Sequence, residues 1–158
     1  MQKPILKGLT MLMFVAAVAL MAALVSAHAQ SSQMVAADIP FEFAVGGKSL
    51  KAGKYSVNPL TTSGDTVLIR SRDSRGAAFL LTRSIQASVV PDKGKLVFHR
   101  YGQVYFLSEI WTPGERQGRR LLKSGAEREI ENQLAAIPSK SELAKHSYER
   151  VEILAVVR

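Results

Sequence analysis

The fold of this chain is restricted most by a repeated alternation of apolar and polar residues between short, glycine-containing turns. In residues 38–45, every second side chain from Ile39 onward is apolar, which is the pattern of a strand with one buried face. Gly46 and Gly47 then mark a turn. Because Pro40 has no N–H to donate to a ladder, we expect this strand to lie at the edge of a sheet or to pair on only one side at Pro40.

Further extended segments follow, separated by turns. Asp73–Gly76 ends in glycine, as type I turns prefer, and it joins two segments into a predicted hairpin. The segments predicted as strands are 55–58, 66–72, 77–89, 95–101, 103–112 and 148–157. Residues 48–54 and 115–123 are rich in basic and polar side chains, so we expect them to be connections.

The two strands on either side of Gly102 are rich in large apolar side chains. In the first, Leu96 and Phe98 alternate with Val97, His99 and Tyr101. In the second, alternation places Tyr105, Leu107 and Trp111 on one face and Val104, Phe106 and Ile110 on the other. Since both faces carry bulky apolar side chains, this hairpin is predicted to be central and covered on both sides.

One helix is predicted, over residues 124–137. Ser124 is a good N-cap, and Glu127 three residues later completes a capping box. Apolar residues recur at helical spacing through Ile137, and Pro138 ends the pattern. The segment 148–157 then reads as the final strand.

These elements predict a mainly β fold: an antiparallel β-barrel or sandwich of about six or seven strands, with one amphipathic helix before a C-terminal strand. A helix before the last strand is a layout that resembles lipocalin-like barrels. We expect residues 38–158 to form a single domain, preceded by a flexible tail at 30–37.

Residues 1–29 have the three regions of a secretory signal peptide. Lys3 and Lys7 precede an apolar run from Leu9 to Val25, and small residues at Ala27 and Ala29 form a cleavage pattern. An uncleaved membrane anchor is the alternative, but the run is short against the roughly 20 apolar residues that a spanning helix needs. We therefore expect a periplasmic or extracellular protein, exported by the general secretion route, with no transmembrane segment after cleavage.

Composition narrows the chemistry and the partners. The chain has no cysteine, which excludes disulfides, thiolate nucleophiles and zinc–thiolate sites. Its formal charge is +8, or +6 once Lys3 and Lys7 are removed with the signal. The positive charge favours an anionic envelope component, and the strand pattern allows a small amphipathic ligand. Nucleic acid is not expected as a partner, because no recognised nucleic-acid-binding module is present.

Three stretches of the sequence are distinctive: PFEFAVGGKSLKAGKY at 40–55, KLVFHRYG at 95–102 with FLSEIW at 106–111, and AERE at 126–129. In these stretches the chain resembles small exported bacterial β-rich proteins to which no activity is assigned. The resemblance extends over nearly all of the chain after the signal. It implies a class and a location, and it implies no site residues.

Motifs for catalysis and cofactor binding are absent from the sequence. There is no G-x-S-x-G elbow, P-loop or G-x-G-x-x-G pattern, so no cofactor is expected. His99 and His146 lie far apart and lack metal-ligand spacing, so no metal site is expected. We name no catalytic residue.

Two groups of residues are candidate binding sites. The aromatic strand pair offers a ligand cavity or a platform for carbohydrate, and its alternative is a layer of packed core aromatics. The residues of this group are His99, Tyr101, Tyr105 and Trp111.

The second group is the arginine-rich segment 115–123, which has the side chains to hold phosphate or carboxylate in forked hydrogen bonds. Its anion-binding candidates are Arg116, Arg119, Arg120 and Lys123, with Arg70, Arg72, Arg75 and Arg83 as potential neighbours. The alternative is a solvated loop neutralised by Glu115 and Glu127.

Three functions remain open from the sequence. The favoured hypothesis is a non-enzymatic ligand-binding or envelope-associated β module. A hydrolase or isomerase whose site is assembled only by the fold would need His99 or His146 beside a carboxylate or hydroxyl, in a pocket. A structural or assembly protein would pair through an edge strand such as 38–45.

Overall fold

The structure is a computed structural model, and it describes residues 35–61, 63–136 and 148–157. The predicted signal peptide, the first part of the predicted tail and His146 lie outside these residues. The described elements are β1 (Val35–Ile39), β2 (Phe43–Val45), β3 (Lys48–Leu50), β4 (Gly53–Pro59), β5 (Thr66–Ser71), β6 (Ala77–Gln86), β7 (Gly94–Tyr101), β8 (Val104–Trp111), β9 (Gln117–Leu121), α2 (Gly125–Ala135) and β10 (Glu149–Val157).

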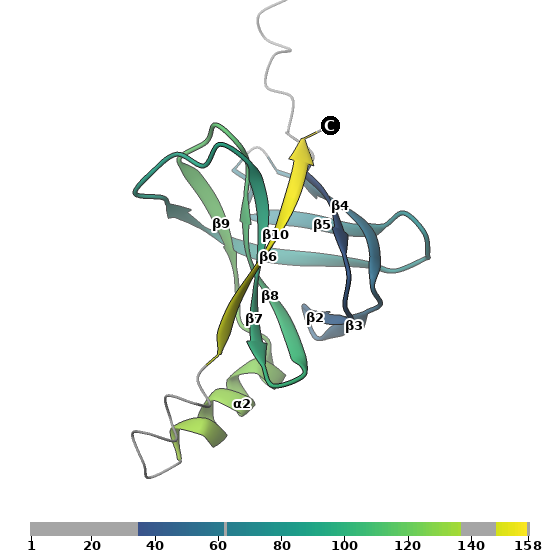
Figure 1. The fold of residues 1–158 in the computed structure, drawn as a ribbon, viewed down its shortest axis with the longest axis vertical. Coiled ribbons are helices and arrows are strands. Elements are labelled where there is room, and N and C mark those ends of the chain that lie inside the picture. The colour runs from purple at the N-terminus through teal and green to yellow at the C-terminus, as the bar shows by residue number, and fades with distance from the viewer. Residues whose placement is uncertain (1–34, 62, 137–147, 158) are drawn as a thin grey trace, which may run out of the picture. The chain divides into compact units, whose positions relative to one another are not determined.

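Eight of these strands form a closed antiparallel barrel. Around the barrel the order is β8-β7-β10-β1-β4-β5-β6-β9, and β9 pairs again with β8 to complete the ring (Figure 1). The short β2–β3 hairpin joins β8 through a parallel contact between Ala44 and Phe106. The prediction of a mainly β fold with a helix before the last strand is confirmed for the described residues, and of the two predicted architectures, barrel and sandwich, the structure is a barrel. The number of strands is somewhat higher than predicted.

The strands that the sequence pattern missed are β3 and β9. Gln117–Leu121 was predicted as part of a charged loop, but it is the strand that closes the barrel, paired with both β6 and β8. Its side chains are mostly polar, and its burial does not alternate: Gly118 and Leu121 are buried, whereas Gln117 and Arg120 are exposed. A closing strand is stabilised by ladder hydrogen bonds on both sides, so it forms without an apolar sequence.

The segment 38–45 is not an edge strand, contrary to the expectation from Pro40. The chain divides there into β1 and β2, with Pro40 in the gap between them, and β1 is paired on both sides, by β4 and β10. Val35–Ala37, which the sequence assigned to the tail, are part of β1. In the described sheet the order ends at β3, a three-residue strand that carries Lys48, and such short basic edges resist pairing with another chain.

Side chains fill the interior of the barrel. Phe98 is fully buried and meets Phe41 and Phe43 edge-on, with ring centroids 5.2 and 5.4 Å apart. Val45 and Leu50 from the β2–β3 hairpin belong to the same buried cluster. An eight-stranded barrel is just wide enough for its own side chains, so this barrel is a packed core.

A β-bulge at Ser108 changes which side chains of β8 face outward. Val97 pairs with Glu109 but Phe98 pairs with Leu107, so Ser108 is the extra residue. Leu107 and Ile110 therefore both face the core, although their spacing is odd, and Glu109 and Trp111 lie on the outer face. Both faces of the β7–β8 hairpin are largely buried, as predicted.

The helix begins where the capping signal placed it. The Ser124 side chain accepts a hydrogen bond from the backbone N–H of Glu127 at 3.1 Å. The helix ends at Ala135 with Ala136 as its C-cap, and the predicted end at Ile137 lies outside the described residues. Figure 1 shows α2 at the end of the barrel where the β7–β8 turn lies.

Candidate functional site

An open pocket of about 260 Å³ lies on the outer wall of the barrel, between the loop that follows β6 and strands β7, β8, β9 and β10. It combines one buried carboxylate with three basic side chains and an aromatic wall. The lining residues are Gln86, Ala87, Val89, Pro91, Lys95, Glu109, Trp111, Arg120 and Arg150.

The Glu109 carboxylate organises this pocket. Glu109 is only 3% exposed. One of its carboxylate oxygens accepts hydrogen bonds from Nε and an Nη of Arg120, at 3.2 and 2.8 Å. The other oxygen accepts from Nε1 of Trp111 at 3.0 Å and lies 3.1 Å from an Nη of Arg150. Trp111 lies on β8, Arg120 on β9 and Arg150 on β10, so the carboxylate links these three strands.

Two opposed effects set the pKa of Glu109. Burial by itself raises the pKa of the carboxyl group, but the hydrogen bonds from Arg120 and Trp111 and the charges of Arg150 and Arg120 outweigh burial and lower it. Burial also opposes the charge on Arg150, yet Glu152 and Glu109 raise the pKa of its guanidinium. Both groups are therefore held in their charged forms.

Positive charge remains in excess around the pocket. Glu152 bridges Lys95, at 3.0 Å, and Arg150, at 3.1 Å. In register, Arg83 on β6 lies directly opposite Arg120 on β9, which adds a further cation beside the pocket. Four basic side chains thus lie at or beside the pocket, and only two carboxylates balance their charge. The basic residues are Arg83, Lys95, Arg120 and Arg150, and the acidic ones are Glu109 and Glu152.

The Arg120 guanidinium also has donors to spare. Its side chain is 57% exposed, and it uses Nε and one Nη on Glu109. Its second Nη has no hydrogen-bond partner in the described part of the chain. An anion in the pocket could accept from this edge of the guanidinium without breaking the contact to Glu109.

Gly118 makes room for the Trp111 ring. A Cβ on Gly118 would lie 2.4 to 2.7 Å from three ring atoms of Trp111, so no larger residue fits there without displacing the ring. The ring is therefore packed flat against β9, and its Nε1 is directed to Glu109. This packing fixes the aromatic wall of the pocket.

The predicted aromatic group divides between two faces of the barrel. Tyr105 pairs with Arg100 and stacks on Phe41 at 3.9 Å, against the core, whereas Tyr101 and Trp111 lie on the outer face. Two causes separate them: the tight turn sets Tyr101 opposite Val104, and the Ser108 bulge reverses the alternation before Trp111. Only Trp111 of the predicted group lines the pocket.

His99 and Tyr101 anchor the helix. Nδ1 of His99 lies 2.9 Å from Oε1 of Glu127, both residues are buried, and Tyr148 stacks on the imidazole at 4.0 Å. The Tyr101 hydroxyl donates a hydrogen bond to Glu131 at 2.8 Å. Burial is the larger cause, and this hydrogen bond the second, that raises the pKa of the Tyr101 phenol. His99 is thus beside a carboxylate, as the hydrolase hypothesis required, but it does not line the pocket described here.

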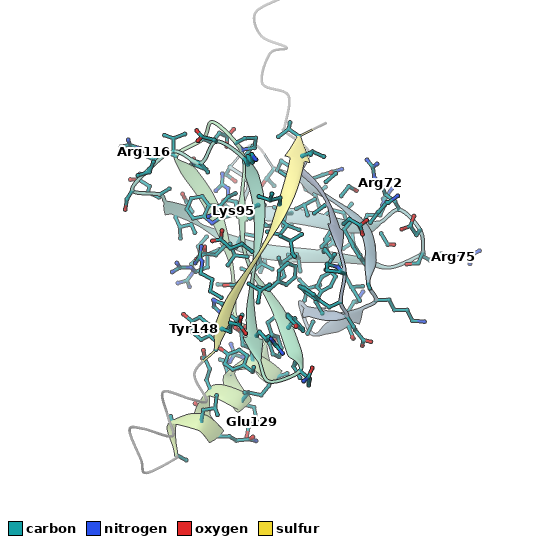
Figure 2. All side chains as sticks on the ribbon, in the orientation of Figure 1. Arg72, Arg75, Lys95, Arg116, Glu129 and Tyr148 are labelled. Atoms are coloured by element: carbon teal, nitrogen blue, oxygen red, sulfur yellow. The ribbon has the colours of Figure 1, made fainter. Side chains whose placement is uncertain are left out.

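The predicted anion-binding residues do not act together either. Arg120 lines the pocket, Arg119 faces inward next to Gly64, Lys123 forms an ion pair with Glu131, and Arg116 is exposed. Figure 2 shows Arg72 and Arg75 on the opposite side of the barrel from Arg116. Of the four arginines expected nearby, Arg83 is the one that pairs with β9.

The sequence analysis missed Glu109, Lys95 and Arg150. A glutamate in the middle of an apolar strand is the signal that could have found the first, because a carboxylate there has to be paired with cations. Arg150 reaches Glu109 only because β10 pairs with β7, and no local sequence pattern indicates that pairing. Lys95 lines the same pocket from β7, opposite Trp111.

Among the residues that the structure describes, no three His, Asp or Glu side chains lie close enough to hold a metal ion. In the same residues, no helix combines the length and apolar character needed to cross a bilayer.

Comparisons of the chain with protein-family models, with curated proteins and with solved structures found no match.

Proposed function

We propose that this protein is an exported, non-enzymatic binding module whose outer pocket holds the anionic group of a small sugar. The observation that carries the proposal is the pair Arg120 and Arg150, held beside Trp111 by the buried Glu109. A third cation, Lys95, lines the same pocket and is paired with Glu152. Guanidinium groups bind carboxylate and phosphate in forked geometry. The part of the Trp111 indole that lines the pocket offers a small apolar contact to a sugar ring.

The size of the pocket supports a small ligand. Its volume of about 260 Å³ lies just below the 300–1,000 Å³ common for drug-sized ligands, so it suits a single acidic sugar or the end of an acidic polymer. The packed barrel interior argues for ligand binding on the outer wall rather than inside the barrel. Periplasmic or extracellular localisation, where acidic envelope polymers occur, rests on the predicted signal peptide.

Trp111 is the sole tryptophan of the chain, so its fluorescence reports directly on the pocket. The test titrates the expressed protein with glucuronic acid, glucose 6-phosphate and glucose while tryptophan emission is recorded. We expect a saturable change with one or both acidic sugars and none with glucose. The two acidic sugars distinguish carboxylate from phosphate recognition.

Two variants test whether the fluorescence response arises from binding in the pocket. Arg150→Gln removes one charged donor and should raise the apparent Kd about tenfold, since hydrogen bonds to charged groups contribute about 1.5–3 kcal/mol. Arg75→Gln, in the β5–β6 turn away from the pocket, is the matched control and should leave Kd unchanged. An equal response to glucose, no response to either acidic sugar up to millimolar concentration, or equal effects of both variants would refute the proposal.

The export component has its own measurement. After expression in a bacterial host, intact-mass analysis should give a chain that begins at Gln30 and is recovered from the periplasm or the medium. A chain that retains Met1 and stays in the cytoplasm would contradict it.

A further inference from the structure

The outer face of β5 and β6 carries an unusual group of exposed apolar side chains. Phe79 is 71% exposed and Leu81 is 63% exposed, although both belong to a regular strand. Leu68 lies opposite Phe79 in the ladder, and Leu122, 47% exposed, follows β9 with its backbone N–H bonded to the carbonyl of Leu81. We call Leu68, Phe79, Leu81 and Leu122 the β5–β6 wall.

Basic residues flank this wall. Arg70 lies on the outer face opposite Ala77, at one end of the β5–β6 ladder, and Arg83 lies opposite Arg120 past the other end. Lys48 reaches the carbonyl of Ala77 at 3.4 Å, near Arg70. No acidic residue occurs among the outward-facing positions of β5 and β6, which are Thr66, Leu68, Arg70, Ala77, Phe79, Leu81, Arg83 and Ile85.

We propose that the β5–β6 wall docks on an anionic lipid surface. Phe79 and Leu81 enter the boundary between headgroups and acyl chains, and Arg70 and Arg83 pair with lipid phosphates. Apolar side chains with basic neighbours are the composition of interfacial membrane-binding surfaces, whose affinity combines buried apolar area with attraction to anionic lipid. Arginine stems lie along the apolar surface while the guanidinium reaches the headgroups.

The charge pattern disfavours a second copy of this chain as the occupant. In a two-fold symmetric contact the same face meets itself, so both copies would bring arginines to the contact, with no carboxylate among its outward-facing positions to neutralise them. The apolar side chains also stand on the convex outer wall of a barrel, and a deformable lipid surface accommodates such projections without a matching groove. None of the four wall side chains lines the pocket, and only Arg83, which lies opposite Arg120, is shared between the two surfaces. Variants of Phe79 and Leu81 therefore test the wall separately from the pocket.

The experiment is flotation of the expressed protein with vesicles of phosphatidylglycerol and phosphatidylcholine in equal amounts, compared with phosphatidylcholine alone. All variants share one N-terminus, identified by mass spectrometry, so the readout is the difference between chains that differ only on the wall. We expect binding to the anionic vesicles, and we expect it to weaken as salt rises from 0.05 to 0.5 M, because salt screens the arginine–phosphate attraction.

The double variant Phe79→Ser with Leu81→Ser should reduce the vesicle partition coefficient at least tenfold, and Arg83→Gln about fivefold. The matched control is Leu154→Ser with Val156→Ser, an exposed apolar pair at alternate positions of β10, 64% and 59% exposed, which should leave binding unchanged. Because all four apolar side chains are largely exposed, neither double variant should impair folding.

Three results would overturn the proposal: equal partition onto both kinds of vesicle, equal losses in the two double variants, or concentration-dependent dimerisation that Phe79→Ser with Leu81→Ser abolishes. The last result, seen by sedimentation velocity without lipid, would assign the wall to a second copy of the chain.

Discussion

Replacing Gly118 by alanine tests the packing of the pocket most directly. Gly118 has no positive φ, so alanine is free of backbone strain there, and in a strand it should stabilise by about 0.5–1 kcal/mol. The structure predicts the opposite sign. The new Cβ would lie 2.4 to 2.7 Å from three ring atoms of Trp111, well inside van der Waals contact.

The magnitude follows from what must move. Trp111 is 7% exposed, so its ring has little free space, and shifting it stretches the 3.0 Å hydrogen bond from Nε1 to Glu109. Overpacking a buried site costs about 1–3 kcal/mol. After the gain from removing a strand glycine, we expect a net loss of about 1–2 kcal/mol in the free energy of unfolding, and a fall in Tm of about 4–8 °C.

Urea denaturation followed by circular dichroism measures the loss, and tryptophan emission, which comes from Trp111 alone, should shift to longer wavelength as the ring is displaced. Gly125→Ala is the control: nothing lies within 4 Å of its added Cβ, and alanine favours the first turn of α2, so it should be neutral or stabilising by up to about 1 kcal/mol. A more stable Gly118→Ala variant with unchanged emission would refute the packing of Trp111 against β9.

Two further outcomes are expected. Glu109→Gln should lower the free energy of unfolding by about 2 kcal/mol at pH 7, since the charged hydrogen bonds of a buried carboxylate are lost. Because the folded pKa of Glu109 lies below the ordinary 4.5, the stability that its charge contributes is full above pH 4.5 and is lost as pH falls through the lowered pKa. Urea denaturation at pH 7 and pH 3 should therefore show the stability of the variant converging on that of the unmodified protein at low pH. Divergence at low pH would contradict the ion-pair geometry. Phe98→Ala should cost about 3–5 kcal/mol because its ring is fully buried between Phe41 and Phe43; a cost below about 1 kcal/mol in urea denaturation would mean that the barrel interior is hollow.

Much of the fold follows from local signals in the sequence. The strands near 66–72 and 95–112 were predicted within a few residues, because alternation and turn glycines act over short distances. The start of α2 was predicted from Ser124, whose side chain accepts a hydrogen bond from the nearby backbone N–H of Glu127. The Glu127 carboxylate, which a capping box would return to Ser124, contacts His99 instead. Composition alone also excluded cysteine chemistry.

The tertiary structure decided what local signals cannot carry. The polar segment Gln117–Leu121 forms strand β9 because its backbone pairs with β6 on one side and β8 on the other. Barrel closure, rather than apolar periodicity, therefore determines that it is a strand. The single extra residue at Ser108 turned Glu109 and Trp111 outward and left Tyr105 in the core. A bulge requires no particular residue type, so the alternation of apolar and polar residues in the sequence does not reveal where it lies.

The candidate site was divided in the same way between sequence and structure. The sequence analysis placed Trp111 and Arg120 in two separate groups of candidate binding residues, on the grounds of side-chain chemistry. Only the ladder β9-β8-β7-β10 brings them together, with Lys95 and Arg150, around Glu109. Side-chain chemistry is a property of each residue, whereas the pocket depends on strand order and register, which are set by contacts between residues far apart in the chain.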